Sequence, residues 1–468
     1  MTKAIAALLA LSLIAAGPRP MDSAMRQQID AIAQNALTQQ NVPGVSVTVS
    51  EGGQIVYARG FGLGSVDNTI GAGASTTFRI GSITKQFTAA SIMLLQQQGK
   101  LNVDDKLSKY LPWAPHASEV TLRQLLTHTS GIPGYTELES FDAASKLPVT
   151  PVGIVQTIAS KPLAFAPGTN WEYSNTNFVL LGLVVQKITG ESYTDFVMRH
   201  LVQPLHLSSM SYWDPLVVHR DAAIGYSTLP LEPVLHTIDW NWDWAWAAGG
   251  LNTTASDLAR WDAALDSGKV VSPASFRMMT TEQKLRNGKP TGYGFGLGIG
   301  MYHKRNVVAH TGGVPGFITE NYTIPRDGVA IVVFGNSDSF QPRAVVRNIA
   351  DVLYGYPHVE AKIKPMNESA TQAARDKRYL QNLLAGRFDS IPLREDAARY
   401  LHGVLVEQYR DLATKLGALH SLELVSADPR PPVLSYYYRA VFANGTMLYT
   451  IGMDPNGTVA GLGLQQWI

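Results

Sequence analysis

Strand-like segments lie at both ends of residues 25–356, with helical sequence and long loops between them. Near the start, residues 45–50 and 54–61 flank Glu51-Gly52-Gly53, a pattern that predicts a β-hairpin. Later strand-like runs occupy residues 293–301, 306–310, 317–324 and 329–334. This order predicts a single α+β domain whose sheet is completed only when the chain returns.

Helices are expected beside these strands. Apolar residues recur every three or four positions from Met25 until the chain reaches Asn41, which predicts a first helix. Residues 82–98 have the composition of a buried helix, and residues 343–353 predict a helix that closes the domain.

A second unit is expected after a polar connector at residues 357–369. Residues 371–384 have a helical pattern. Strand-like runs follow at residues 422–425, 434–442, 447–452 and 459–464, with Asn-Gly turns between the later ones. The pattern predicts a small C-terminal α+β domain over residues 362–468.

The N-terminus has the pattern of an export signal. Lys3 precedes an apolar run from Ala4 to Ala16, which is shorter than the roughly 20 residues of a transmembrane helix. A signal peptide is therefore expected at residues 1–17, with a buried N-terminal helix as the alternative. No later run reaches transmembrane length, so we expect a soluble mature protein in the periplasm or outside the cell.

Charge and cysteine content exclude several classes of function. Lys and Arg number 38 against 37 Asp and Glu, and the net charge of +1 gives no basic surface for nucleic acid. The chain has no Cys, which excludes disulfides, thiol catalysis and thiolate metal sites. We also find no metal-binding or phosphate-binding motif, so no cofactor or metal is expected, and a small-molecule or peptide substrate is the expected partner.

Three short motifs place oxygen and nitrogen groups where catalysis can use them. Ser82 and Lys85 are three residues apart at a helix start, which puts a hydroxyl and an amine on one face. Tyr173-Ser174-Asn175 follows, and His310-Thr311-Gly312 ends a predicted strand. Each motif alone has an ordinary structural explanation, such as a Ser helix cap followed by a surface Lys. Their combination is hard to explain as coincidence.

In this combination the chain resembles the serine β-lactamase and penicillin-binding protein superfamily, in its class C-like branch, from about Gln27 to Leu353. Further segments typical of that branch are Leu125-Leu126-Thr127-His128-Thr129-Ser130-Gly131-Ile132-Pro133, Ala248-Gly249-Gly250-Leu251 and His310-Thr311-Gly312-Gly313-Val314-Pro315-Gly316. The resemblance implies a β-lactamase/penicillin-binding-protein-like catalytic domain, an antiparallel sheet flanked by helices plus a helical region, at residues 25–356.

The same resemblance implies a role for each matched residue. The catalytic residues would be the acylated nucleophile Ser82 and the proton-transfer pair Lys85 and Tyr173. The substrate-binding residues would be Asn175, His310 and Gly313, and the N–H groups of Ser82 and Gly313 would form the oxyanion hole.

The residues themselves leave the general base open. A serine attacks poorly unless a base takes its proton, yet unperturbed Tyr and Lys are both protonated at neutral pH, with pKa values of about 10. A Lys85 ammonium beside Tyr173 favours phenolate, whereas burial favours a neutral Lys85. Either group is available as the base, and the two titrations are expected to be coupled.

His310 bears on the substrate. Familiar β-lactamases usually have a Lys at this position, and a largely neutral imidazole attracts a substrate carboxylate less strongly. We therefore expect a hydrolase acting on peptides or amides that contain D-amino acids, resembling a carboxypeptidase or aminopeptidase, or on small esters. The alternatives are a penicillin-binding receptor that is acylated without efficient turnover, and a true β-lactamase.

Other features are expected to be structural. His128 is assigned to fixing the turn at residues 129–133. If residues 240–246 are extended, four alternating Trp residues share one side and line either an acyl pocket or the core. The C-terminal unit contains none of the three motifs, so we expect it to cap the cleft or mediate assembly.

Overall fold

The computed structural model describes residues 20–212, 221–227, 234–237, 240–356, 366–428, 434–454 and 456–466. The predicted signal peptide at residues 1–17 lies outside the described residues, and it stays a prediction. Within the described ranges, no helix is both long and apolar enough to cross a lipid bilayer.

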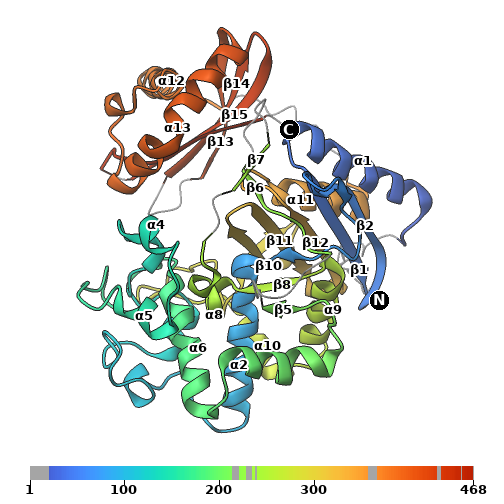
Figure 1. Cartoon of the computed structure of the whole chain (residues 1–468), viewed down its shortest axis with the longest axis vertical. Coiled ribbons are helices and arrows are strands. Elements are labelled where there is room, and N and C mark those ends of the chain that lie inside the picture. Colours follow the sequence, from blue (N-terminus) through green and yellow to red (C-terminus); the bar gives the residue numbers. More distant parts are fainter. Residues whose placement is uncertain are drawn as a thin grey trace, which may run out of the picture.

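The main sheet joins strands from both ends of residues 25–356, as the sequence predicts (Figure 1). Its order is β3-β2-β1-β12-β11-β10-β9, and neighbouring strands pair antiparallel. The strands are β1 (Gly44–Glu51), β2 (Gln54–Ser65), β3 (Ile70–Gly71), β9 (Gly298–Tyr302), β10 (Arg305–Val314), β11 (Phe317–Ile324) and β12 (Val329–Gly335). The long-range closure is the β1/β12 pair, in which Val45 lies opposite Gly335 and Glu51 opposite Val329.

One strand prediction was partly wrong. Residues 293–301 were expected to be one strand, but β9 begins only at Gly298. The N–H of Gly294 donates to the carbonyl of Leu297, and Gly296 has a φ of +67°, so the backbone turns before the strand starts.

Helices cover both faces of the main sheet. On one face α1 (Ser23–Gln39) and α11 (Pro342–Tyr354) pack against each other and against the strands, and on the other lies α9 (Ala255–Asp266). Alternate residues of β12 accordingly belong to different cores: Ile331 and Val333 pack with α1 and α11, whereas Val332 and Phe334 pack with the helical region. The sheet is thus buried on both sides.

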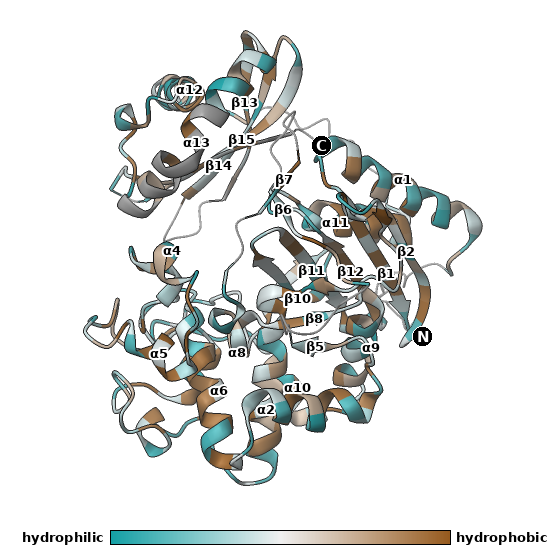
Figure 2. Cartoon of the chain, in the orientation of Figure 1, coloured by the Kyte–Doolittle hydropathy of each residue, from teal (hydrophilic) through white to brown (hydrophobic). Residues whose placement is uncertain are grey.

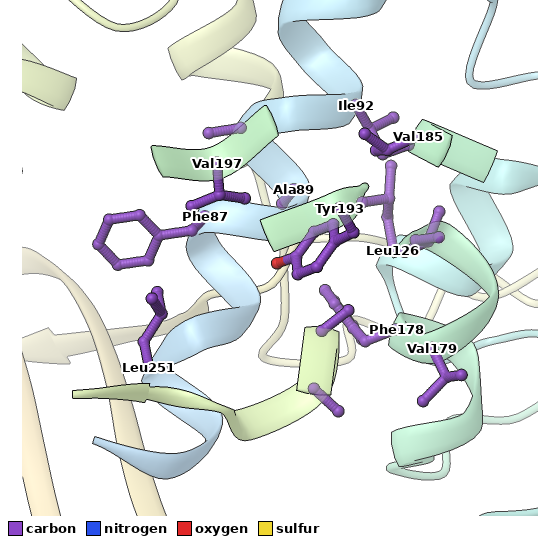
Figure 3. Packing of buried hydrophobic residues seen from close by; sticks show 14 of the residues in the cluster. Phe87, Ala89, Ile92, Leu126, Phe178, Val179, Val185, Tyr193, Val197 and Leu251 are labelled. Atoms are coloured by element: carbon purple, nitrogen blue, oxygen red, sulfur yellow. The ribbon is translucent and has the colours of Figure 1, made fainter. Parts of the chain in front are cut away.

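The helical region surrounds α2 (Lys85–Gln97) and α6 (Asn175–Thr189), which are both largely buried. Figure 3 shows Ile92 of α2 close to Val185 of α6, and Figure 2 shows α6 coloured mainly as hydrophobic. The surrounding helices are α3 (Leu122–Leu126), α4 (Phe141–Ala144), α5 (Pro151–Gln156), α7 (Tyr193–Val197), α8 (Trp246–Gly249) and α10 (Pro273–Met279). Short strands are β4 (Phe78–Arg79), β5 (Ser211–Tyr212), β6 (Tyr226–Ser227), β7 (Leu235–His236) and β8 (Leu251–Thr253).

The C-terminal region has its own hydrophobic cluster. Its sheet has the order β13-β14-β15-β16, formed by β13 (Leu419–Asp428), β14 (Leu434–Phe442), β15 (Gly445–Met453) and β16 (Val459–Gln466). Helix α12 (Ala370–Leu384) matches the predicted helix, whereas α13 (Glu395–Leu416) was not predicted. Helix α13 places Leu401, Leu412 and Leu416 in the cluster, so it is an essential part of the packing.

Candidate active site

A tight turn positions Ser82 between the sheet and α2. Residues Gly81–Thr84 form a 3₁₀ turn that leads directly into α2. Gly81 has a φ of +50°, and a Cβ there would lie 2.9 Å from the backbone nitrogen of Gly313. Glycine is therefore required at this position, both for the backbone conformation and for the approach of β10. The turn leaves the half-buried Ser82 side chain at the start of α2.

Lys85 is fully buried and lies at the centre of the site. Its Nζ is 2.9 Å from Ser82 Oγ, 2.8 Å from Asn175 Oδ1 and 2.8 Å from the carbonyl oxygen of Ala248. Burial lowers the pKa of Lys85 well below its usual value, because desolvation penalises the ammonium. A neutral amine donates its two N–H groups to the Asn175 and Ala248 oxygens, which leaves its lone pair for the proton of Ser82.

Tyr173 lies against Lys85 with its hydroxyl buried. Lys85 Nζ is 4.7 Å from the centre of the Tyr173 ring. Within the described residues, Tyr173 Oη has no hydrogen-bond partner of good geometry. Burial raises the pKa of Tyr173, and the nearby Ser82 hydroxyl offsets this only in part. The environment thus favours a neutral phenol, a proton donor, over a phenolate.

His310 is buried, and two hydrogen bonds fix its orientation. Its Nδ1 donates to the carbonyl of Thr311 at 2.7 Å, and its Nε2 accepts from the hydroxyl of Tyr293 at 2.8 Å. Burial is the main cause that lowers the pKa of His310 to about 3, because desolvation penalises the imidazolium. The imidazole consequently carries no charge that would attract a substrate carboxylate.

The end of β10 lies directly against the turn that carries Ser82. Strand β9 pairs with β10 only as far as Ala309, so residues 310–314 are free of that neighbour. A Cβ at Gly312 would be 1.9 Å from the carbonyl oxygen of Ile80, so only glycine allows this contact. The backbone nitrogen of Gly313 is thereby held beside Gly81, next to Ser82, as an oxyanion hole requires.

A chain of hydrogen bonds extends from Lys85 to an acidic residue that sequence reasoning missed. Asn175 Nδ2 donates to Thr136 Oγ1 at 3.0 Å, and Thr136 donates to Glu137 Oε1 at 2.8 Å. Solvent reaches the Glu137 side chain, yet the surrounding protein raises the pKa of this carboxyl. Glu137 comes shortly after the family segment that ends at Pro133, but it belongs to no sequence motif. Its place in the site is therefore seen only in the structure.

His128 positions the segment that carries Tyr173 and Asn175. Its Nδ1 accepts from the backbone N–H of Ser174 at 3.2 Å, and its carbonyl accepts from the N–H of Glu172 at 3.0 Å. The imidazole also packs 4.4 Å from the Tyr173 ring, centre to centre. His128 was expected to fix the turn at residues 129–133. These contacts instead connect it to the Tyr173-Ser174-Asn175 motif.

The Trp residues pack on the core, which was one of the two alternatives. The backbone is not extended here, since residues Trp242–Trp244 form a 3₁₀ turn and Trp246 begins α8. Trp244 is buried, and Trp240, Trp242 and Trp246 pack on the same core. This backbone course places the Ala248 carbonyl oxygen 2.8 Å from Lys85 Nζ.

The described residues contain no cluster of three or more His, Cys, Asp or Glu side chains suited to a metal ion.

Known proteins resemble this chain over the same residues. The sequence model for the family described as Beta-lactamase matches residues 29–356. Protein flp of Staphylococcus aureus (strain COL) is 29% identical over 331 residues, or 68% of this chain. The chain covers 65% of that relative's length. Penicillin-binding protein 4* of Bacillus subtilis (strain 168) is 29% identical over 356 residues, 72% of this chain and 79% of the relative.

Solved structures extend the comparison. A D-stereospecific amidohydrolase from Streptomyces sp. is 28% identical with a TM-score of 0.60, covering 71% of this chain and 98% of its own. The octameric penicillin-binding protein homologue from Pyrococcus abyssi has a TM-score of 0.66 at 22% identity, covering 94% of this chain and 98% of its own. The second likeness, which shows the fold alone, spans nearly the whole chain.

Proposed function

The chain belongs to the Beta-lactamase family, within the serine β-lactamase and penicillin-binding protein superfamily, and from this premise we propose that it is a serine acyl hydrolase that forms a covalent ester at Ser82. The observation that carries the proposal is the environment of Lys85 Nζ, which has two fixed oxygen acceptors and the Ser82 hydroxyl as its third neighbour. This arrangement favours the neutral amine as the general base.

The proposed reaction moves one proton from Ser82 to the leaving group through Lys85 and Tyr173. Lys85 takes the Ser82 proton as Oγ attacks the substrate carbonyl, and the N–H groups of Ser82 and Gly313 stabilise the oxyanion. The neutral phenol of Tyr173 gives a proton to the leaving amine as the carbon–nitrogen bond breaks, and the Lys85 ammonium restores that proton. Water then attacks the Ser82 ester, which releases the acid and regenerates the serine hydroxyl.

Charge around the cleft supports a substrate with a free amino group. His310 is neutral, whereas Glu137 presents a solvent-accessible carboxyl that is coupled to Lys85 through Thr136 and Asn175. Asn175 is the proposed ligand of the substrate amide, and Glu137 is suited to bind an ammonium group. We therefore propose amides or peptides of D-amino acids as substrates, with small esters next. The Streptomyces relative, a D-stereospecific amidohydrolase, supports this choice.

A substrate panel tests the proposal. D-amino acid amides, a D-Ala-D-Ala peptide, a p-nitrophenyl ester and a chromogenic cephalosporin are assayed together, with Ser82→Ala as the matched control. We expect the D-amino acid amide to give the highest kcat/KM and Ser82→Ala to abolish both turnover and acylation. Undiminished activity in Ser82→Ala would refute Ser82 as the nucleophile, and a far higher rate with the cephalosporin would indicate a true β-lactamase.

Because the chain is similar to penicillin-binding protein 4*, we retain one alternative proposal, a receptor that is acylated without turnover. Intact-mass measurement after mixing with penicillin distinguishes the two. A stable adduct at Ser82 with no released product favours the receptor, whereas product release with recovery of the unmodified mass favours the enzyme.

We further propose that residues 362–468 are a separate domain that caps the site. A cavity of about 650 Å³ is lined by Thr311 and Arg343 on one side and by Tyr437 and Thr450 on the other. Thr311 follows His310 directly, so the C-terminal sheet reaches the strand that carries the site. Ending the chain at Tyr356 should alter substrate range while leaving acylation of Ser82 by penicillin intact, as intact mass would show. A folded protein of that length that cannot be acylated would contradict the assignment.

A further inference from the structure

A second cavity, of about 620 Å³, lies between the main sheet and helices α9 and α10. None of Ser82, Lys85, Tyr173 and His310 lines it. The exposed residue Lys269 is part of its lining, so the cavity reaches the surface. In Figure 1, α9 and α10 lie below and beside β1, on the opposite side of the sheet from α1. The proposed active site does not account for this cavity.

Three residues that line the cavity, Gln86, Asp262 and Asn321, carry buried polar atoms without partners. Asn321 Nδ2 donates to Asp262 Oδ1 at 2.8 Å. Within the described residues, Asp262 Oδ2, Asn321 Oδ1 and Gln86 Nε2 have no hydrogen-bond partner. Their residues are only 7%, 3% and 1% exposed. Buried polar groups in folded proteins nearly always have a partner, either protein or ordered water, so three such atoms on lining residues of one cavity leave hydrogen-bonding capacity that a ligand could use.

The unpartnered atoms define the chemistry of that ligand. Two of them, on Asp262 and Asn321, accept hydrogen bonds, and the third, on Gln86, donates. Burial, and then the neighbouring Asp266 carboxylate, raise the pKa of Asp262 to about 7, so a cation beside this carboxyl would stabilise its charged form. The nearby guanidinium of Arg260 is already hydrogen-bonded to Asp257. A group with several N–H donors and a positive charge fits the two acceptors.

The remaining walls specify the rest of the ligand. Leu205, Phe276 and Leu297 line the same cavity and offer an apolar surface. A bare metal ion does not fit, because such a site needs several ligating side chains, and the acidic lining residues Asp262 and Asp266 are not part of any cluster of three or more His, Cys, Asp or Glu among the described residues.

We propose that this cavity is a binding site for a small organic primary ammonium ion, whose N–H groups donate hydrogen bonds to the side-chain oxygens of Asp262 and Asn321. An oxygen on the same ligand accepts from Gln86, and its apolar body packs against Phe276 and Leu297. Because Gln86 follows Lys85 in α2, an occupied cavity contacts the helix that carries the catalytic lysine. The proposal stands on this cavity and does not depend on the proposed hydrolase activity.

Calorimetric titration of the full chain with phenylalaninol tests the site. This probe has a primary amine, a hydroxyl and an apolar ring, and it contains no bond for a hydrolase to cleave. The titrated protein carries Glu137→Gln, so that binding of ammonium in the active-site cleft is removed. We expect saturable binding of one equivalent, and no binding of 3-phenyl-1-propanol, which lacks the amine.

Two variants separate binding from folding. Asp262→Asn should weaken phenylalaninol binding at least about tenfold, yet raise the melting temperature of the empty protein, because an uncompensated buried carboxyl is removed. A purely structural Asp262 would give the opposite change in melting temperature. Gln86→Leu should also weaken binding, and it serves if the first variant does not fold. Absence of saturable binding up to about 10 mM, the signature of a cavity that holds only water, would overturn the proposal, as would unchanged affinity in Asp262→Asn.

Discussion

Lys85 and Gln86 are consecutive buried residues of α2, and the protein surrounds them in opposite ways. Lys85 Nζ has three polar neighbours within 2.9 Å, whereas Gln86 Nε2 has no hydrogen-bond partner among the described residues. Around Lys85 the partners surround the one amine that we propose as the general base. Around Gln86 the polar groups of the second cavity are left unpaired, as expected where an external ligand completes the hydrogen bonds. One helix thus presents a preorganised site and an incomplete one.

The largest effect is expected at Lys85. Lys85→Met keeps the length of the side chain but removes the base, so turnover of the best substrate should fall by about 10⁴-fold, the upper range for a positioned proton-transfer group. Steady-state kinetics measure the loss. Circular dichroism serves as the control for folding. A fall of less than tenfold in a folded variant would mean that another group activates Ser82.

Tyr173 should matter most when the leaving group needs a proton. Tyr173→Phe retains the ring contact with His128 and removes only the hydroxyl, so amide turnover should fall by about 10²–10⁴-fold. A p-nitrophenyl ester should lose far less, because p-nitrophenolate departs without protonation. Comparing kcat for the two substrates checks this. Equal losses would assign Tyr173 to the attack of Ser82 rather than to leaving-group protonation.

The neutral state of His310 predicts a loss of stability in acid. The native pKa of about 3 lies below the unfolded value of about 6.5, so the unfolded state binds a proton first. Stability is fully present above pH 6.5 and is lost progressively as pH falls toward 3. Between pH 7 and pH 5 the free energy of unfolding should fall by about 2 kcal/mol because of His310 alone.

Urea denaturation at the two pH values measures this term. The fall in unfolding free energy between pH 7 and pH 5 should be smaller by about 2 kcal/mol in His310→Gln than in the wild type. An equal fall in the two proteins would show that His310 is not held neutral by the native structure.

A smaller, selective effect is expected at Glu137. Glu137→Gln should raise KM for D-amino acid amides about tenfold, equivalent to about 1.4 kcal/mol, because the ammonium loses its charged partner. N-acetylated amides carry no such charge and should be unaffected. Glu139→Gln, which changes a nearby exposed glutamate, is the matched control. If the two substrate types respond alike, Glu137 does not bind the amino group.

Local spacing in the sequence was enough to predict part of this site. Ser82 and Lys85 are three residues apart on one helical turn, so their contact follows from helix geometry alone. The return of the chain to complete the sheet was confirmed, because the strand patterns on each side of the helical sequence were clear. The β1/β12 pairing brings the N-terminal strands beside the strands that hold His310.

What the sequence missed depends on long-range contacts. Glu137 joins the site through Thr136 and Asn175, and no periodic pattern marks such a chain of hydrogen bonds. The sequence left the Trp residues between an acyl pocket and the core, because alternation predicts one-sided side chains only in an extended backbone, and residues 242–244 form a 3₁₀ turn. The Asp262 cavity likewise requires residues from α2, α9 and β11 to come together.

The smallest effect is expected at Gln86, the residue of α2 whose Nε2 has no partner among the described residues. Gln86→Leu replaces a buried amide that lacks a partner on Nε2 with an apolar side chain of similar size, so the free energy of unfolding should rise by about 1 kcal/mol, the lower range for an unsatisfied buried group. Ser91→Ala is the matched control on the same helix, because the Ser91 hydroxyl is buried but donates to the carbonyl of Phe87 at 2.8 Å. Removing that satisfied group should leave stability equal or slightly lower. Urea denaturation of both variants without added ligand measures the difference. If Gln86→Leu is the less stable of the two, the Gln86 amide is satisfied in solution and the contrast between the two regions of α2 does not hold.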